Sequence, residues 1–266
     1  MDQQDSQTET LEAIISRFEA RILEKKSSQD TTGANLSSPV EYKCNLCQDR
    51  GIILDDETNL AEPCRCQEQR KRERMFKNSR ITPAFKAKTM DNFTTKDRSV
   101  IVRKMLQTAR HYVSNFGDHG ENNWLVFLGE PGCGKTHLSL AVANHMLDNN
   151  IPVLYFPHVE GMGELKNTFS HNEDSLEEKL AAMRKVPVLV WDDLFKGRRE
   201  VTPWTLEIVF DVLNYRYLNL LPTIISSEWT DVMLLGLDKA IGSRILERGR
   251  GHLVVVEGMD NNYRLA

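Results

Sequence analysis

Residues 124–147 read WLVFLGEPGCGKTHLSLAVANHML, and this stretch decides the fold. It opens with an apolar run typical of a buried strand, passes through a glycine-rich loop and ends in a pattern typical of a helix. The loop lies in the strand-to-helix context that the P-loop pattern G-x-x-x-x-G-K-[ST] requires. Its eight residues are Gly129, Glu130, Pro131, Gly132, Cys133, Gly134, Lys135 and Thr136. The stretch therefore predicts a site for the phosphates of a nucleotide.

The residue types of this loop suit ATP bound with Mg²⁺. Glycines let backbone N–H groups curl around phosphates, and the following helix N-terminus adds positive potential. We expect Lys135 to reach the β- and γ-phosphate oxygens and Thr136 to bind Mg²⁺. Cys133 occupies a variable position, where a tolerated small residue is favoured over a redox switch.

A second apolar run, VPVLVWDD at 186–193, ends in two carboxylates. Paired acids at this point after a P-loop are typical of the Walker B element. We expect Asp192 to bind Mg²⁺ and Asp193 to orient or deprotonate the attacking water. The alternative is that an aspartate caps the following helix.

Further short apolar runs alternate with helical patterns along the C-terminal two thirds of the chain. Alternating strands and helices predict a parallel sheet covered by helices, so the expected fold class is a three-layer α/β domain. The expected strands are 124–129, 153–156, 186–193, 222–227 and 252–258.

Composition limits the protein class. The 266 residues carry a formal net charge of −4 and a pI near 6.0, which gives no global nucleic-acid signature. The polar, acidic start MDQQDSQTET lacks the regions of a secretory signal, and no run of 18 apolar residues occurs. We expect a cytoplasmic protein without a membrane partner.

The N-terminal third divides at a stretch rich in turn formers. Residues 8–25 place apolar side chains at helical spacing, and 27–40 resemble a flexible linker. The expected domains are 1–40 (amphipathic helix and linker), 41–80 (cysteine module and basic helix) and 81–266 (ATPase).

Four of the five cysteines crowd into a short segment, as Cys44-x-x-Cys47 and Cys64-x-Cys66. Four thiolates favour structural, tetrahedral Zn²⁺, which would hold together a segment too small to form its own core. The closing pair is Cys-x-Cys rather than the commoner Cys-x-x-Cys. Free thiols or an iron–sulfur cluster are the alternatives.

A group of motifs closely resembles bacterial and phage replicative helicase loaders of the DnaC and DnaI type, which are AAA+ ATPases. Transposition helper ATPases share much of the pattern. The resemblance covers about residues 81–266, and the cysteine-bearing segment also resembles that of phage and DnaI-type loaders. The motifs are GEPGCGKTHLSLAVAN, VLVWDDLF, NYRYLNLLPTIISSE, IGSRILER and DNNYR.

The resemblance implies further site residues. Ser227 takes the sensor 1 position, with Ser226 as its neighbour, Arg244 is the arginine finger and Arg264 is sensor 2. An arginine finger supplied by a neighbouring subunit would tie hydrolysis to self-association through the AAA+ domain. The alternative for Arg244 is a surface salt bridge. Asp193 stands where most AAA+ proteins have Glu, which leaves open vigorous hydrolysis or an ATP-controlled switch.

The implied function is a loader that binds a hexameric replicative helicase through its N-terminal region and delivers it to single-stranded DNA. The basic run within 70–80 and the segment 158–184, with Lys166 and Phe169, are candidate DNA contacts; a solvated helix face and a core aromatic are the alternatives. Rival functions are a transposition helper on duplex DNA, a non-hydrolysing adaptor and, remotely, a P-loop kinase.

Overall fold

The computed structural model describes residues 42–55, 60–170, 173–197 and 200–264. The helix expected over 8–25 and the linker expected over 27–40 lie outside these residues. The chain divides into two compact units, Met1–Glu62 and Pro63–Ala266. Ahead of the larger sheet, β1 (Ile52–Asp55) and β2 (Leu60–Pro63) form a two-stranded sheet.

The larger unit is built on one five-stranded sheet in the order β4-β5-β6-β3-β7, with every neighbouring pair parallel. Each strand coincides with an expected apolar run, so the predicted parallel α/β architecture is confirmed. The strands are β3 (Leu125–Gly129), β4 (Val153–Pro157), β5 (Val188–Asp192), β6 (Thr223–Ser227) and β7 (Leu253–Val256).

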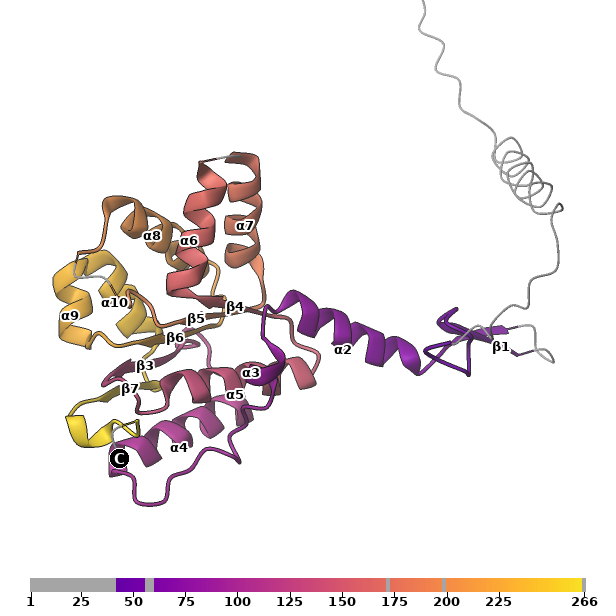
Figure 1. Cartoon of the computed structure of the whole chain (residues 1–266), viewed down its shortest axis with the longest axis horizontal. Coiled ribbons are helices and arrows are strands. Elements are labelled where there is room, and N and C mark those ends of the chain that lie inside the picture. Colours follow the sequence, from indigo (N-terminus) through magenta and orange to yellow (C-terminus); the bar gives the residue numbers. More distant parts are fainter. Residues whose placement is uncertain (1–41, 56–59, 171–172, 198–199, 265–266) are drawn as a thin grey trace, which may run out of the picture. The chain divides into compact units, whose positions relative to one another are not determined.

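Helices cover both faces of this sheet and give three layers (Figure 1). One face is covered by α3 (Pro83–Lys86), α4 (Val100–Ser114) and α5 (Lys135–Asp148). The other is covered by α6 (His158–Phe169), α7 (Glu173–Lys185), α8 (Pro203–Leu218), α9 (Asp231–Leu237) and α10 (Lys239–Arg248). A 3-10 turn, η1 (Met259–Asn261), follows β7.

The central strand β3 supplies side chains to two separate cores because successive residues of a strand point to opposite faces. Leu125 and Phe127 pack into the core beneath α4 and α5, whereas Val126 and Leu128 pack into the core beneath α8 and α10. All five residues of β3 are buried, as are those of β5 and β6. Burial on both faces explains why these strands are continuously apolar.

The basic run lies on α2 (Cys66–Asn78), a helix with no buried residue. Its C-terminal turn is attached to the large sheet, since Met75 and Phe76 pack against the α4–α5 core and Tyr155 N–H donates to the Ser79 carbonyl at 2.8 Å. Within the described residues, no helix is long and apolar enough to cross a bilayer.

Parallel strands bring their carboxyl ends to one edge of the sheet. The strands β5, β6 and β3 are consecutive in the sheet. They end at Asp192, Ser227 and Gly129, respectively. Ligands of open parallel sheets bind outside this edge. The fold therefore brings the P-loop and the acid pair together from positions far apart in sequence.

Candidate functional site

The glycine-rich loop joins β3 to α5, and its glycines adopt conformations that side chains disfavour. Gly129 has φ 98° and Gly134 has φ 105°. A Cβ added at Gly129 would lie 2.0 Å from the Val256 carbonyl oxygen, and one at Gly134 would lie 2.5 Å from the Phe93 ring. The loop thus requires glycine at both positions, and it leads directly into the N-terminus of a 14-residue helix, where backbone N–H groups attract an anion.

Lys135 is a buried ammonium group held by its own loop. Its Nζ donates to the carbonyl oxygens of Gly129 at 2.7 Å and Glu130 at 2.8 Å. Burial lowers the pKa of Lys135, while the charges of Cys133, Asp193 and Glu228 act in the opposite direction. Burial disfavours the charged ammonium form of Lys135, and the negative charge of a bound phosphate would stabilise that form.

Asp192 forms the centre of a hydroxyl cluster at the carboxyl end of β5. It is 3% exposed. Thr136 Oγ1 donates to Oδ1 at 3.0 Å, Tyr155 O–H donates to Oδ2 at 2.8 Å, and the Ser226 hydroxyl also donates to Oδ1. Burial raises the pKa of Asp192, and the hydrogen bond from Ser226 opposes this effect. The adjoining threonine hydroxyl and carboxylate are oxygen ligands of the kind Mg²⁺ prefers, so these residues fit that ion.

Asp193 starts a tight turn in the left-handed region, with φ 55°. Its N–H donates to Ser226 Oγ at 2.8 Å, which fixes the turn against β6. The Asp193 carboxylate forms an ion pair with Lys196, whose Nζ lies 2.6 Å from Asp193 Oδ2 and 3.3 Å from Glu228 Oε1. Burial acts to lower the pKa of Lys196, but the hydrogen bond and charge of Asp193, with the charge of Glu228, raise it on balance.

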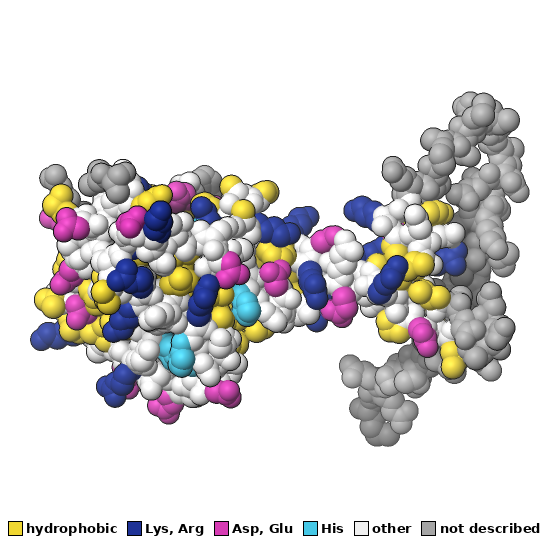
Figure 2. Space-filling model, turned by 90° about the horizontal axis from the view of Figure 1, so that it is seen from below, with side chains coloured by type: hydrophobic (Ala, Val, Ile, Leu, Met, Phe, Trp, Pro, Cys, Tyr) yellow, Lys and Arg dark blue, Asp and Glu magenta, His cyan; other side chains and the backbone are white. Residues whose placement is uncertain are grey.

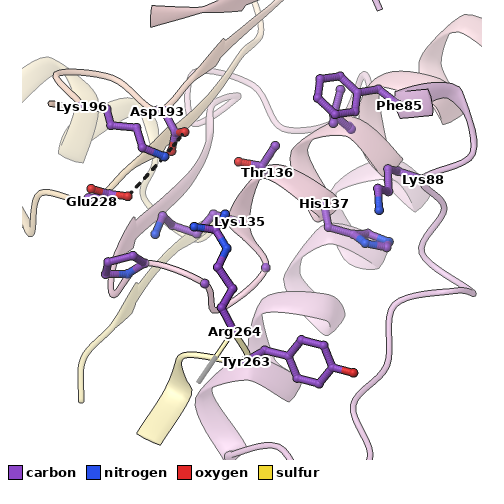
Figure 3. Close-up of a pocket in the computed structure, with 14 residues that line it drawn as sticks. Phe85, Lys88, Lys135, Thr136, His137, Asp193, Lys196, Glu228, Tyr263 and Arg264 are labelled. Carbon is purple, nitrogen blue, oxygen red and sulfur yellow. Dashed lines mark hydrogen bonds and ion pairs between the residues drawn. The ribbon is translucent and has the colours of Figure 1, made fainter. Parts of the chain in front are cut away.

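Much of the P-loop, together with Asp193, Lys196 and Glu228, faces a cavity of about 350 Å³ (Figure 3). Asp192 is not among the described lining residues and lies behind Thr136, to which it is hydrogen-bonded. In Figure 3, Asp193, Lys196 and Glu228 lie at one end, and Phe85, Lys88 and His137 lie at the other. The lining residues are Phe85, Lys88, Pro131, Gly132, Gly134, Lys135, Thr136, His137, Leu140, Asp193, Lys196, Glu228, Tyr263 and Arg264. Four cations and two acids line it, which favours an anionic ligand.

The sequence and fold agree with known proteins that bind ATP. Residues 53–266 match the family described as IstB-like ATP binding protein. The chain belongs to this family. Its AAA+ fold, expected from the sequence resemblance, is confirmed by a crystal structure of the DnaC helicase loader, with TM-score 0.55, 26% identity, and coverage of 66% of this chain and 100% of that chain.

Two relatives from Bacillus subtilis show the range of the similarity. The phage-like element PBSX protein XkdC is 38% identical over 239 residues, covering 86% of this chain and 88% of XkdC. The replicative helicase loader DnaI is 29% identical over 166 residues, covering 61% of this chain and 51% of DnaI. The expected similarity to DnaC- and DnaI-type loaders is therefore confirmed.

The serines that end β6 in this IstB-like chain have different surroundings. Ser226 contacts both acids, through the Asp192 carboxylate and the Asp193 N–H. Ser227 is buried, donates to the Leu194 carbonyl at 2.6 Å and accepts from Trp229 N–H at 3.1 Å. Among the described residues, neither serine belongs to the cavity lining.

The two candidate arginines lie in different places. Arg264 lines the cavity, and in Figure 3 its side chain extends toward Lys135. Arg244 is outside the described lining: its Nε donates to Asn214 Oδ1 at 3.0 Å, and its guanidinium lies over the rings of Phe210 and Tyr217 at 5.1 Å and 5.3 Å. A single chain thus brings Arg264 to the P-loop and leaves Arg244 on the α8–α10 surface.

Sequence reasoning missed one whole wall of the cavity. The segment that carries Phe85 and Lys88 is attached to α5 by Asn144, whose Nδ2 donates to the carbonyls of both residues at 3.0 Å and 2.8 Å. His137 Nε2 lies 2.9 Å from the Thr89 carbonyl. Each of these contacts joins two residues that are more than 45 positions apart in the sequence. Only the placement of His137 next to Thr136 signalled part of this wall in the sequence.

The four clustered cysteines fit a metal. The sulfur atoms of Cys44, Cys47, Cys64 and Cys66 all lie within 4.8 Å of one another. Tetrahedral zinc with Zn–S bonds of about 2.3 Å requires sulfur atoms about 3.8 Å apart. Gly51 N–H also donates to Cys47 Sγ at 3.3 Å, which holds this sulfur atom in place. The expectation of a four-cysteine zinc module is supported by this grouping.

The candidate DNA contacts are the exposed side chains of α2 and the exposed C-terminal end of α6. Phe169 is 48% exposed at the end of α6, and its ring centroid lies 6.5 Å from that of Trp204. On the face shown in Figure 2, basic and acidic side chains are interspersed rather than gathered in one basic field. This face therefore offers no continuous basic surface for DNA.

Proposed function

We propose that this IstB-like protein is an ATP-dependent loader that binds a hexameric replicative DNA helicase and delivers it to single-stranded DNA during replication initiation. The main support is that this chain covers the full length of the chain in a crystal structure of the DnaC helicase loader, and that its P-loop and Asp193 line one cavity. The similarity to XkdC, a phage-like element protein, favours a role in phage or mobile-element replication.

We propose that the bound ATP is hydrolysed slowly. Asp193 would orient or deprotonate the attacking water, and Ser227 would occupy the sensor 1 position. Thr136 and Asp192 would hold Mg²⁺, which supplies charge neutralisation at the phosphate oxygens. Arg264 would act as sensor 2, and its place in the cavity lining supports this role. The adenine ring would lie at the end formed by Phe85, Lys88 and His137, since the opposite end carries the acids.

Arg244 is proposed to act on the nucleotide of a neighbouring subunit. Its position outside the described lining of its own cavity, beside Phe210 and Tyr217, supports action in trans. Hydrolysis would then depend on self-association. Removing Arg244 should lower turnover in the assembled state and leave ATP binding by one chain intact.

The helix expected over residues 8–25 and the zinc module are proposed to contact the helicase. The exposed side chains of α2 and the α6–α7 segment with Lys166 and Phe169 are proposed to contact single-stranded DNA. Such contacts weaken steeply with salt when they involve phosphates. A truncation that begins near Ser38 should lose helicase binding and keep ATP binding.

The test is size-exclusion chromatography with the replicative helicase of the source organism, in ATP and in ADP. The arms are the wild-type chain, Arg244→Ala and Arg250→Ala; Arg250 is an exposed arginine just beyond α10 and serves as the matched control. A stable complex with helicase in ATP supports the loader. A lower ATP turnover in Arg244→Ala than in Arg250→Ala, at concentrations at which both variants assemble, supports the trans role. No complex under any condition contradicts the loader.

A second candidate is a transposition helper that assembles on duplex DNA, and the similarity of this chain to an insertion-sequence ATP-binding protein of Geobacillus stearothermophilus favours it. ATP-dependent filaments on duplex DNA, without a helicase complex, would support it. A non-hydrolysing adaptor is the third, and the ion pair that engages Asp193 favours it. Unchanged turnover in Asp193→Asn would point to the adaptor.

A further inference from the structure

Lys196 places a second ammonium group at the acid end of the cavity. The turn that carries it is fixed: Leu194 N–H donates to the Ser226 carbonyl at 2.8 Å, and Lys196 N–H donates to the Asp193 carbonyl at 2.9 Å. Leu194 and Phe195 are fully buried, so they anchor this turn in the core. The lysine side chain is 33% exposed, which leaves its tip free to change partners.

The present partners of Lys196 are the acids of the cavity. Its Nζ bridges Asp193 at 2.6 Å and Glu228 at 3.3 Å, and Figure 3 shows these contacts beside Lys135. The ion-pair contact engages Oδ2 of Asp193. A carboxylate engaged by an ammonium group is a weaker base and is less able to hold water.

We propose that Lys196 is a ligand of the terminal phosphate of ATP, and that its transfer from Asp193 and Glu228 to this phosphate frees the Asp193 carboxylate for the attacking water. This inference rests on the proposed ATP hydrolysis. It makes Lys196 a positioning residue for Asp193 as well as a phosphate-binding residue. Lys196 should change partners when ATP binds and not when ADP binds, because ADP has no γ-phosphate to compete with Asp193 and Glu228 for Lys196.

The charges of the cavity support this exchange. Lys135, which reaches the β- and γ-phosphates in P-loop proteins, lies within electrostatic range of Asp193, Glu228 and Lys196. A terminal phosphate beside Lys135 would be repelled by the carboxylates of Asp193 and Glu228 unless a cation lies between the phosphate and these carboxylates. Lys196 lies beside both acids and has three donors, so it can face the phosphate while remaining close to Glu228.

The ratio of the ADP and ATP dissociation constants measures the proposal directly. Calorimetry would compare ADP with a non-hydrolysable ATP analogue at fixed Mg²⁺. In Lys196→Gln the preference for the ATP analogue should fall about tenfold, the size of one charge-assisted hydrogen bond. In Glu228→Gln the preference should rise, because a competitor for Lys196 is removed.

Lys88→Gln is the matched control. It removes the same charge from the same cavity at the Phe85–His137 end, so it should change both dissociation constants by one common factor. An equal loss of preference in Lys88→Gln would overturn the proposal, since it would reflect net charge alone. Unchanged or parallel constants in Lys196→Gln would also overturn it.

The outcomes separate this inference from the proposed function. If the wild type binds both nucleotides and Lys135→Ala binds neither, ATP binding through the P-loop stands; an unaltered preference in Lys196→Gln then refutes only the role of Lys196. Binding of neither nucleotide by the wild type would contradict both. A thermal melt of each variant checks that the substitution leaves the fold intact.

Discussion

Replacing Arg216 by methionine should destabilise the sheet at the end opposite the nucleotide cavity. Arg216 is fully buried on α8, and burial lowers its pKa to about 9, which still leaves it cationic at neutral pH. Its guanidinium donates to carbonyls that precede β5 and β6, including those of Val186 at 2.8 Å and Met183 at 3.0 Å, and to that of Pro222. It therefore joins the amino ends of two strands whose carboxyl ends carry Asp192 and Ser226.

The magnitude follows from the acceptors left behind. Three carbonyls, those of Met183, Arg184 and Val186, would lose this donor at a cost of about 1 to 3 kcal/mol each, or about 3 to 9 kcal/mol together. The Pro222 carbonyl keeps a second donor, Leu189 N–H at 3.3 Å. Methionine also removes the cost of burying a charged guanidinium, which offsets part of this loss. The free energy of unfolding should therefore fall by about 3 to 5 kcal/mol. At about 2 to 4 °C per kcal/mol for a domain of this size, the Tm should fall by about 6 to 20 °C.

Thermal and urea unfolding of Arg216→Met, with Arg250→Met as an exposed control, tests this. Arg216→Lys should recover only part of the loss, since one ammonium group cannot reach carbonyls on both strands. A Tm of Arg216→Met equal to that of the control would refute the reasoning. It would mean that water or a small backbone shift satisfies the carbonyls at little cost.

Three further predictions concern the P-loop, pH and zinc. Gly134→Ala should abolish binding of ATP and ADP in calorimetry, because its Cβ would overlap the Phe93 ring and φ 105° disfavours alanine; retained affinity would contradict the loop geometry. Burial lowers the pKa of His252 and of His137 below the ordinary 6.5, so the unfolded chain takes up protons first as pH falls. The free energy of unfolding should therefore decrease as pH drops through 6.5 toward the lower folded pKa values, and His252→Gln should flatten that slope in urea titrations; a slope of opposite sign would contradict this. Elemental analysis should find zinc in the purified chain, a chelator should remove it, and Cys47→Ser should lower the content while Cys133→Ser should not; equal zinc in both variants would contradict the four-cysteine site.

The sheet could be predicted from sequence because its signals are local. Each parallel strand is buried on both faces and reads as an apolar run, so periodicity located all five. The roles expected of Lys135, Thr136 and Asp192 required only a loop pattern and an acid after a strand. Thr136 and Asp192 indeed share a hydrogen bond at 3.0 Å.

The rest of the site depends on contacts between distant segments. Phe85 and Lys88 reach the cavity because Asn144 binds their carbonyls, and no local pattern encodes that contact. Lys196 was close in sequence to the acid pair, but its ion pair depends on the left-handed turn at Asp193. Aspartate is compatible with many conformations, so no local residue pattern signals this turn.

Under the proposed function, the cations of the cavity act on the nucleotide of their own chain, and Arg244 acts on the nucleotide of a neighbouring chain. Lys135, Lys196 and Arg264 line the cavity of the chain that carries them, whereas Arg244 lies over Phe210 and Tyr217 outside the described lining. Removal of a cation from the first group should therefore change nucleotide affinity at any protein concentration. Removal of Arg244 should change turnover only at concentrations that permit assembly. If Lys196 responds to the terminal phosphate as proposed, a single chain can distinguish ATP from ADP before it meets a partner, and the neighbour's arginine is needed only for the chemical step.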